Sequence, residues 1–220
     1  MPDLNRLREA ILGGDSKLAV AVTKEALAEN VDPMDLVTRY MIPAMDEVGR
    51  RFECQEYFVP ELLIAARAMK GALELIRPML AERGIPSAGR VVIGTVRGDL
   101  HDIGKNLVGS MLEGAGFDVY DLGTDVSPQK FISEAKAKNA TIVALSALLT
   151  TTMTAMKATI EEFKKEGIRE QFRIIIGGAP VTQEYADQIG ADGYSQNAHG
   201  AVGLVRSLQH KPNHPSPAAV

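Results

Sequence analysis

The residues best suited to chemistry lie together in one short segment, residues 98–104, which reads Gly-Asp-Leu-His-Asp-Ile-Gly. The segment follows an almost continuous apolar run, Val91–Val96, of the kind that forms a strand buried on both faces. A helix with one apolar face is predicted after it, over about 105–115. An open α/β sheet builds its binding site where a strand leads through a loop into a helix, so we expect ligand chemistry here. His101 is the only one of the four histidines placed in such a loop.

His101 and Asp99, two residues apart, favour one kind of site over several others. Zinc needs three or four protein ligands, and only one histidine is well placed here. The first strand is not followed by G-x-G-x-x-G, and no G-x-x-x-x-G-K-[ST] loop is present, so neither a dinucleotide nor a P-loop nucleotide is indicated. A single histidine could instead give one axial bond to a metal already held by a macrocycle. Asp99 would then accept the other ring N–H and fix the tautomer.

Small and polar residues also follow the other strands that the sequence predicts. They are Asp121-Leu122-Gly123-Thr124-Asp125, Ser146-Ala147-Leu148-Leu149-Thr150-Thr151-Thr152, Gly177-Gly178-Ala179-Pro180 and Ser195-Gln196-Asn197-Ala198. Any one of these loops, taken alone, is an ordinary set of turn residues. Small or polar residues at all five strand ends favour a slot in which the backbone closely approaches a bound cofactor.

Strands and helices alternate in the second half of the chain. This pattern predicts a flavodoxin-like or Rossmann-like doubly wound sheet of five parallel strands with helices on both faces. The strands are expected near 91–96, 118–122, 141–147, 173–176 and 192–195, and the helices near 105–115, 127–138, 152–166, 182–189 and 199–208. Residues up to about 83 show only helical spacing, which predicts four or five helices in a bundle. The expected fold class is therefore α/β with an N-terminal helical bundle.

Capping residues, prolines and glycines set the limits of these parts. Asp15 and Asp32 are expected to cap helices, Pro43 to kink or divide one, and Pro60 to open the last helix of the bundle. The apolar stripe of that last helix is expected to be Leu63, Ala66, Met69, Leu73, Ile76 and Leu80. The predicted domains are a helical domain over 1–84, a linker over 85–89, an α/β domain over 90–210 and a disordered tail over 211–220.

Composition narrows the class of protein further. The 220-residue chain has a formal net charge of −4, which gives no electrostatic reason to expect nucleic acid or an anionic membrane as a partner. No apolar run is long enough to span a bilayer, and the first residues lack an apolar signal core. The single cysteine, Cys54, excludes an intrachain disulfide and suits a reducing compartment. We therefore expect a soluble cytoplasmic protein.

Three spaced motifs resemble those of cobalamin-binding proteins. Residues 98–104 look like the D-x-H-x-x-G signature, Ser146-Ala147-Leu148 resembles the S-x-L element, and Gly177-Gly178 resembles the paired glycines that follow it. Segments within 45–70 resemble the helical cap domain of the same family, so the resemblance covers about residues 3–208. The family comprises the cobalamin-binding part of methionine synthase and the corrinoid proteins of methanol, methylamine, betaine and methoxy-aromatic methyltransferase systems. A cap plus a cobalamin domain, without a catalytic barrel, is similar to the second group.

The resemblance implies a role for each matching residue. His101 would be the lower axial ligand of cobalt and Asp99 its hydrogen-bond partner. Thr152 would supply the hydroxyl that extends this relay, at a position where the family often has serine. These three residues form the expected catalytic set, and His101 is the expected metal ligand. The cofactor-binding residues implied are Gly98, Asp99, Leu100, His101, Asp102, Ile103, Gly104, Ser146, Leu148, Thr150, Thr152, Gly177, Gly178 and Ala198.

The function implied by the resemblance is that of a methyl carrier, a non-autonomous corrinoid subunit of a multi-component methyltransferase system. A partner methyltransferase would move a methyl group from its donor onto Co(I), and a second would pass it from methyl-Co(III) to tetrahydrofolate or coenzyme M. The implied cofactor is cobalamin or a related corrinoid, with its cobalt. The implied partners are a substrate-specific methyltransferase, a corrinoid:tetrahydrofolate or corrinoid:coenzyme M methyltransferase, and a reductive activator.

The cap would shield the methyl-bearing face of the corrinoid. Phe52, Tyr57 and Phe58 are candidates for this, and core packing is an equal alternative for all three. Three other functions stay open. The chain could be a cobalamin-dependent sensor, although it contains no DNA-binding module. It could be a mutase-type cobalamin subunit, which would need a partner barrel. It could also be a receiver-like domain in which His101 is merely structural.

Overall fold

The computed structural model describes residues 3–85 and 87–209. Its contacts divide the chain into two units. One contains the residues up to Ala88 together with Ser110–Phe117, and the other contains Gly89–Gly109 and the chain from Asp118 onward. The domain limits expected from the sequence stay a prediction, and the expected tail over 211–220 lies outside the described residues.

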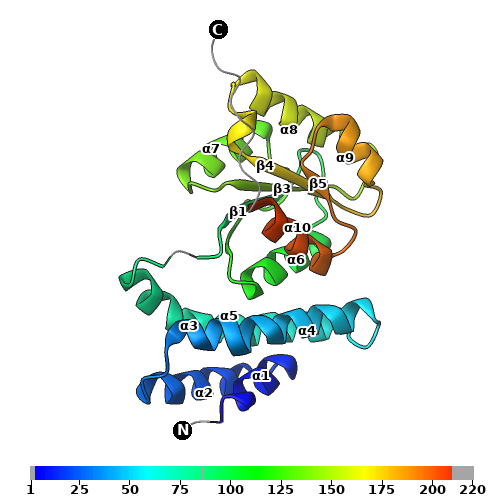
Figure 1. The fold of residues 1–220 in the computed structure, drawn as a ribbon. Coiled ribbons are helices and arrows are strands. Elements are labelled where there is room, and N and C mark those ends of the chain that lie inside the picture. Colours follow the sequence, from blue (N-terminus) through cyan, green and yellow to red (C-terminus); the bar gives the residue numbers. More distant parts are fainter. Residues whose placement is uncertain (1–2, 86, 210–220) are drawn as a thin grey trace. The chain divides into compact units, whose positions relative to one another are not determined.

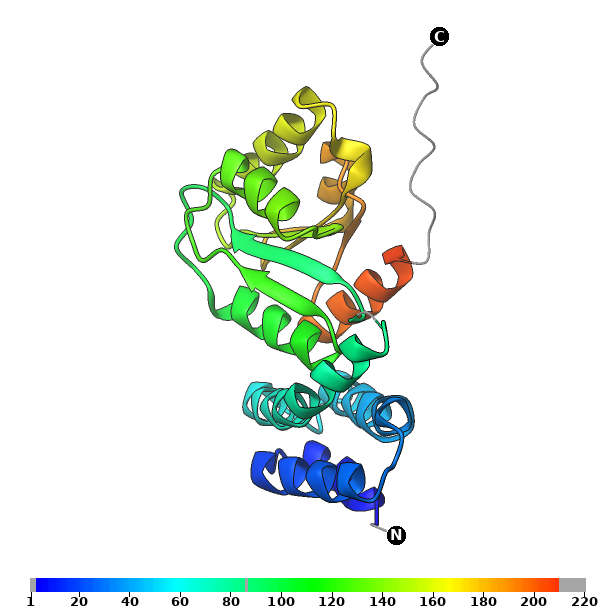
Figure 2. The same cartoon turned by 90° about the vertical axis from the view of Figure 1, so that its left-hand side faces the viewer.

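Helices make up the first unit, and no strand occurs among its described residues. They are α1 (Asn5–Leu12), α2 (Ser16–Ala28), α3 (Pro33–Asp35), the π-helical η1 (Leu36–Met41), α4 (Ile42–Glu53) and α5 (Val59–Glu82). In Figures 1 and 2, α1 and α2 form one layer and α4 and α5 form a second. The helix starts expected at Asp15 and Asp32 are confirmed, because each carboxylate accepts a backbone N–H of the following turn, at 2.9 Å and 2.8 Å.

Two prolines act as the sequence predicts, and one apolar stripe differs from its expectation. Pro43 lies in the first turn of α4, directly after the π-helical turn, and Pro60 lies in the first turn of α5. The stripe predicted for α5 was wrong at Leu63, which is 39% exposed. Leu62 is buried in its place, because helical spacing allows either leucine and the packing of α5 on its partner helices selects Leu62.

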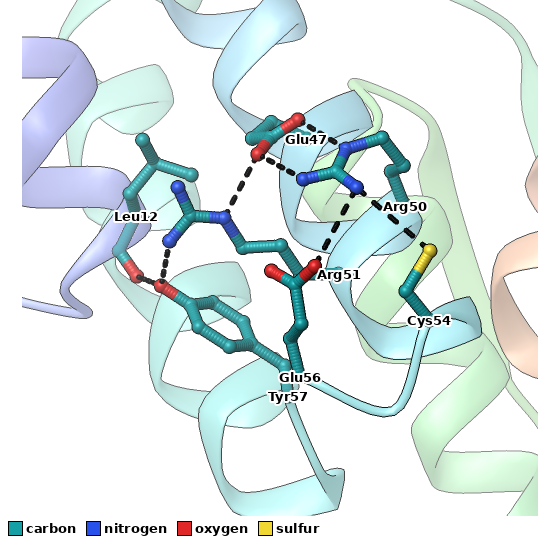
Figure 3. A network of polar contacts seen from close by, with 7 residues as sticks. All are labelled: Leu12, Glu47, Arg50, Arg51, Cys54, Glu56 and Tyr57. Carbon is teal, nitrogen blue, oxygen red and sulfur yellow. Dashed lines mark hydrogen bonds and ion pairs between the residues drawn. The ribbon is translucent and has the colours of Figure 1, made fainter.

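A polar network joins α1 to the end of α4 and the loop before α5 (Figure 3). Glu47 accepts from Arg50 and from Arg51, with each Nε 2.8 Å from a carboxylate oxygen. Arg51 donates to the Tyr57 hydroxyl at 2.9 Å, and that hydroxyl lies 3.2 Å from the carbonyl oxygen of Leu12. Hydrogen bonds from Arg50, and then from Arg51, lower the pKa of Glu47 from 4.5 to about 2.

We expect Glu47→Gln to lower the urea midpoint at pH 7 and to leave it unchanged near pH 2. A carboxylate whose pKa is lower in the folded state stabilises fully above its unfolded value of 4.5, and this contribution is lost as the pH falls toward about 2. Urea unfolding of both proteins at pH 7, 4 and 2 measures the difference. The variant Glu82→Gln, a change of the same type at an exposed position at the end of α5, is the control. A difference between Glu47→Gln and the native protein that stayed constant with pH would contradict this assignment.

The second unit is built on one sheet of five parallel strands in the order β2-β1-β3-β4-β5. The strands are β1 (Arg90–Thr95), β2 (Asp118–Asp121), β3 (Ile142–Ser146), β4 (Arg173–Gly177) and β5 (Gly193–Tyr194). The helices are α7 (Pro128–Ala137), α8 (Met153–Lys165), the 3₁₀ turn η2 (Arg169–Gln171), α9 (Gln183–Ile189), α10 (Ala198–Gln209) and α6 (Ile103–Gly114), whose residues from Ser110 onward are grouped with the first unit. This strand order is that of flavodoxin-like folds, so the predicted fold class is confirmed.

Helices cover both faces of this sheet. Figures 1 and 2 show α7, α8 and α9 on one face and α6 and α10 on the other. The face under α7 and α8 forms the main core, in which Phe131, Ile160 and Phe163 pack on buried strand residues such as Val143. Among the described residues, no helix is both long and apolar enough to cross a membrane.

Candidate functional site

Three neighbouring strands end at the same level of the sheet, and this alignment assembles the site. Thr95 of β1 pairs in register with Ser146 of β3, and Ser146 pairs with Gly177 of β4. The loops that follow these strands therefore begin side by side at the carboxyl edge, where open α/β sheets bind ligands. The loop after β1, which contains His101 and is called the histidine loop below, lies close to the loop that follows Ser146 and to the paired glycines Gly177 and Gly178. About 80 residues separate the first of these segments from the last.

The Asp99 carboxylate orients His101. Its Oδ1 lies 2.8 Å from His101 Nδ1 and accepts the His101 backbone N–H at 3.0 Å. The loop is also fixed from β1, because the Thr95 hydroxyl donates to the His101 carbonyl at 2.8 Å. With Nδ1 protonated and held by Asp99, Nε2 becomes the nitrogen whose lone pair can bind a metal. The histidine side chain is 50% exposed, and no hydrogen bond reaches Nε2 from the part of the chain that the structure describes.

The second oxygen of Asp99 is held by the loop after β3. It accepts the Thr152 hydroxyl at 2.6 Å and the backbone N–H groups of Leu148 and Leu149 at 2.8 Å and 3.3 Å. Complete burial of the side chain by itself would raise the pKa of Asp99. The hydrogen bonds from Thr152, His101 and Leu148 outweigh burial and lower that pKa well below its usual range, so the carboxylate is ionised.

We expect Thr152→Val to reduce the free energy of unfolding by about 1–3 kcal/mol, the usual loss when a buried charged acceptor is deprived of a donor. Valine keeps the shape of threonine but removes the hydroxyl that donates to Asp99. Thr152→Ser restores the hydroxyl and should lie within about 1 kcal/mol of the native protein. Urea unfolding of the cofactor-free proteins gives the values. Equal stability of the valine and serine variants would show that this hydrogen bond contributes nothing.

Apolar side chains around His101 are exposed at the same edge of the sheet. Leu100 is 73% exposed and Ile103 82%, while Leu148 and Leu149 are each 43% exposed. Exposed large apolar residues around one oriented histidine suit a broad, flat ligand that is largely hydrophobic and contains a metal. A corrinoid has this character, and the donor set fits it, because one histidine nitrogen is offered and the macrocycle supplies the other ligands. The described residues hold no group of three or more His, Cys, Asp or Glu side chains able to bind a bare ion.

The paired glycines leave no space for a side chain at one of their two positions. Gly178 has φ +135°, and a Cβ placed there would lie 1.8 Å from the carbonyl oxygen of Ala147. Gly177 has an ordinary backbone, and a Cβ there would lie 3.4 Å from the carbonyl oxygen of Ser195. The loops after β3, β4 and β5 thus approach one another backbone to backbone, with Ala198 buried at the start of α10. Gly178 is therefore required by the close approach of the protein's own backbone, and the cofactor contact expected at the paired glycines stays a prediction.

The remaining predicted site residues lie at the same edge, but not all of them near the histidine ring. Ser146 is half-buried at the end of β3, and Thr150 is exposed in the loop after it. Asp102 is also exposed, and its carboxylate accepts from Asn106 at 3.1 Å rather than from His101. Gly98 lies at the start of the histidine loop, whereas Gly104 lies in the first turn of α6, which begins at Ile103 rather than near the expected residue 105. The cofactor contacts of these residues stay predictions.

The sequence interpretation did not predict the contacts of three residues beside this loop: Lys105, Asp121 and Asp125. The Lys105 ammonium forms an ion pair with Asp121, and the Asp125 carboxylate accepts the Gly98 N–H at 2.7 Å. Both aspartates were visible as polar residues at the end of the second strand. The signal that could have identified Lys105 is its position, since a cation in the first turn of a helix opposes the helix dipole and needs a carboxylate partner.

Comparison with known proteins identifies the class that this fold and site define. Residues 89–202 and 3–77 match the two family models described as B12 binding domains. The chain belongs to the B12-binding corrinoid proteins, and its cofactor is a corrinoid.

Individual relatives narrow this class. Trimethylamine corrinoid protein 1 of Methanosarcina acetivorans is 45% identical over 92% of this chain and 95% of its own length. A cobalamin-binding protein of Desulfitobacterium hafniense matches in structure with a TM-score of 0.78 and 34% identity, over 94% of this chain and 98% of its own. The methanol:cobalamin methyltransferase complex MtaBC of Methanosarcina barkeri contains a chain that matches with a TM-score of 0.79 and 28% identity, over 96% of this chain and 86% of its own. The protein is therefore a homologue of the corrinoid proteins of methylamine and methanol methyltransferase systems.

Proposed function

We propose that this protein is a methyl carrier, which accepts a methyl group from a donor through one methyltransferase and delivers it to an acceptor through a second. The observation that carries the proposal is the Asp99–His101 pair, with Nδ1 held and Nε2 open, in a chain that aligns almost end to end with a trimethylamine corrinoid protein. The bound corrinoid supplies the chemistry, since its reduced cobalt is the nucleophile that takes up the methyl group.

His101 and its partners would control ligation during the cycle. His101 would hold the cobalt of a bound corrinoid through Nε2, the ring nitrogen that Asp99 leaves open, and would have to be able to release it and bind it again. Asp99 stays ionised and keeps its hydrogen bond from Nδ1, so the ring returns to ligation in the correct tautomer. Thr152 and two backbone N–H groups hold this carboxylate in position while the ring moves.

The methyl donor and the methyl acceptor would be selected by partner proteins. A substrate-specific methyltransferase, of which the methanol enzyme in MtaBC is one example, would load the carrier. A corrinoid:tetrahydrofolate or corrinoid:coenzyme M methyltransferase would unload it, and a reductive activator would rescue oxidised cofactor. A methylamine is the donor that the name of the Methanosarcina acetivorans relative supports. The cytoplasmic location expected from the lone cysteine belongs to this proposal.

The test is methyl loading of the reconstituted protein. We expect the protein to retain about one hydroxocobalamin after desalting and, once reduced, to show the spectrum of methylated corrinoid on addition of trimethylamine with a purified trimethylamine methyltransferase. Parallel reactions with mono- and dimethylamine, methanol and betaine, each with its own methyltransferase, identify the donor. Methyl iodide, which needs no enzyme, is the control for a reactive cofactor. A protein that methyl iodide methylates but that no enzyme and donor pair can load would contradict the carrier role.

A further inference from the structure

The loop after β2 contacts the start of the histidine loop through Asp125. This residue has a left-handed backbone, φ +53°, which aspartate adopts more readily than most residues. Its Oδ1 accepts the Gly98 N–H at 2.7 Å, and its own N–H donates to the carbonyl oxygen of Asp99 at 3.0 Å. The dipeptide Gly98–Asp99 is therefore held at its first N–H and at its last carbonyl by one residue.

The same segment contacts the first turn of α6, the helix that follows the histidine loop, through Asp121. The Lys105 ammonium, on a side chain that is 1% exposed, forms an ion pair with Asp121 Oδ2 and donates to Asn106 Oδ1 at 2.6 Å. Asp121 Oδ1 accepts the Gly123 N–H at 2.9 Å, so the carboxylate is itself fixed. Lys105 directly follows Gly104, in the first turn of α6, where its charge opposes the helix dipole. The negative charge of Asp121 offsets this unfavourable interaction between the Lys105 ammonium and the helix dipole.

We propose that Asp121 and Asp125 act as a two-point clamp that positions His101. The proposal rests on the proposed function, because it concerns a ring that leaves cobalt and returns to it. Ordering a free loop costs conformational entropy each time the ring rebinds, and a loop already held at both ends does not incur that cost. The clamp therefore raises the fraction of cofactor that is ligated by His101. Asp121, Asp125 and Lys105 are positioning residues, since their contacts are with the residues on either side of His101 and not with its ring.

Two substitutions of Asp125 separate its backbone from its carboxylate. Glycine adopts φ +53° without strain and removes the side chain, whereas asparagine tolerates the same backbone and keeps an oxygen that accepts from Gly98. We expect Asp125→Gly to lower the equilibrium constant between histidine-on and histidine-off cofactor by about 3- to 10-fold, the factor that one net hydrogen bond supplies. Asp125→Asn should stay within about twofold of the native protein, since it keeps the acceptor.

The matched control is Asn139→Gly. Asn139 has a similar backbone, φ +49°, but lies in the turn between α7 and β3, at the opposite end of the sheet. The Asn139→Gly variant should leave the equilibrium between histidine-on and histidine-off cofactor unchanged. The second clamp point is tested by Lys105→Met, which keeps the apolar stem, removes the ammonium and leaves Asp121 hydrated, since that carboxylate is 47% exposed. It should shift the equilibrium in the same direction as Asp125→Gly.

Two measurements decide the proposal. The visible spectrum of the reconstituted proteins gives the histidine-on fraction, and amide hydrogen exchange in the cofactor-free proteins reports the order of the loop at Gly98. Faster exchange and a lower histidine-on fraction in Asp125→Gly, with recovery in Asp125→Asn, is the result expected. An unchanged histidine-on fraction in both Asp125→Gly and Lys105→Met would overturn the clamp. A native protein without histidine-ligated cobalt would instead overturn the proposed ligand, so the two failures are distinguishable.

Discussion

The alanine variant of His101 should bind corrinoid without a protein nitrogen on the cobalt. In the Co(II) state a nitrogen ligand splits each cobalt line of the electron paramagnetic resonance spectrum into three, and this splitting should vanish in His101→Ala. The fold should persist, because the side chain is 50% exposed and contributes little packing. Cofactor should also stay bound if its tail lies in the slot near Gly178. The oxidised cofactor should show the base-off visible spectrum.

The control for this experiment is His199→Ala, which removes a histidine from α10. It should keep both the splitting and the base-on spectrum. Asp99→Asn gives an intermediate case, since an amide oxygen can still accept from Nδ1 but leaves His101 a weaker base. Losing such a partner typically costs about 10- to 100-fold in metal affinity or activity. If the nitrogen splitting survives in His101→Ala, the ligand assignment fails.

Gly178→Ala should be the most damaging single-methyl change in the slot. The new Cβ would lie 1.8 Å from the carbonyl oxygen of Ala147, and φ +135° is a conformation that alanine rarely adopts. The methyl group would clash with backbone atoms of Ala147 rather than with a flexible side chain, so β3 or β4 would have to move. We expect a loss of roughly 3–5 kcal/mol in the free energy of unfolding, from strain and overpacking together. Urea unfolding of the cofactor-free protein measures it.

Gly177→Ala is the matched control for this prediction. Its Cβ would meet only an ordinary contact, 3.4 Å from the carbonyl oxygen of Ser195, on an ordinary backbone. Its stability should fall by no more than about 1 kcal/mol. If it folds but releases corrinoid on desalting, the methyl group has entered the space that the cofactor tail needs. Comparable stability of the two alanine variants would mean that β3 and β4 adjust easily at this point.

The sequence predicts the elements well because the signals for them are local. Continuous apolar runs predict the strands, and capping aspartates and prolines predict the helix starts. The error at Leu63 arose from the choice between two adjacent leucines, where helical spacing alone leaves both open until the partner helices are known. The Asp99–His101 pair is predictable because its members lie two residues apart.

Local sequence patterns do not predict contacts between residues far apart in the chain, except where a family motif indicates them. The Thr152 hydroxyl was placed by resemblance alone, and its 2.6 Å contact with Asp99 depends on the pairing of β1 with β3. The left-handed backbone of Asp125 had no local signal strong enough to identify it, and the position of Lys105 indicated a carboxylate partner without indicating which one. The bond between Tyr57 and Leu12 spans 45 residues and likewise depends on how helices pack.

The bonds that hold Asp99 also determine when the site can form during synthesis of the chain. Its carboxylate oxygen Oδ2 is satisfied by residues 49 to 53 positions later, in the loop after β3. A nascent chain that ends before residue 148 therefore contains the Asp99–His101 pair but lacks every group that holds Oδ2. The ribosome must extend the chain through β3 to Thr152 before this carboxylate is fully held, and through β4 before the paired glycines exist. We therefore expect the complete site to form late in synthesis, since contacts of high sequence separation form late.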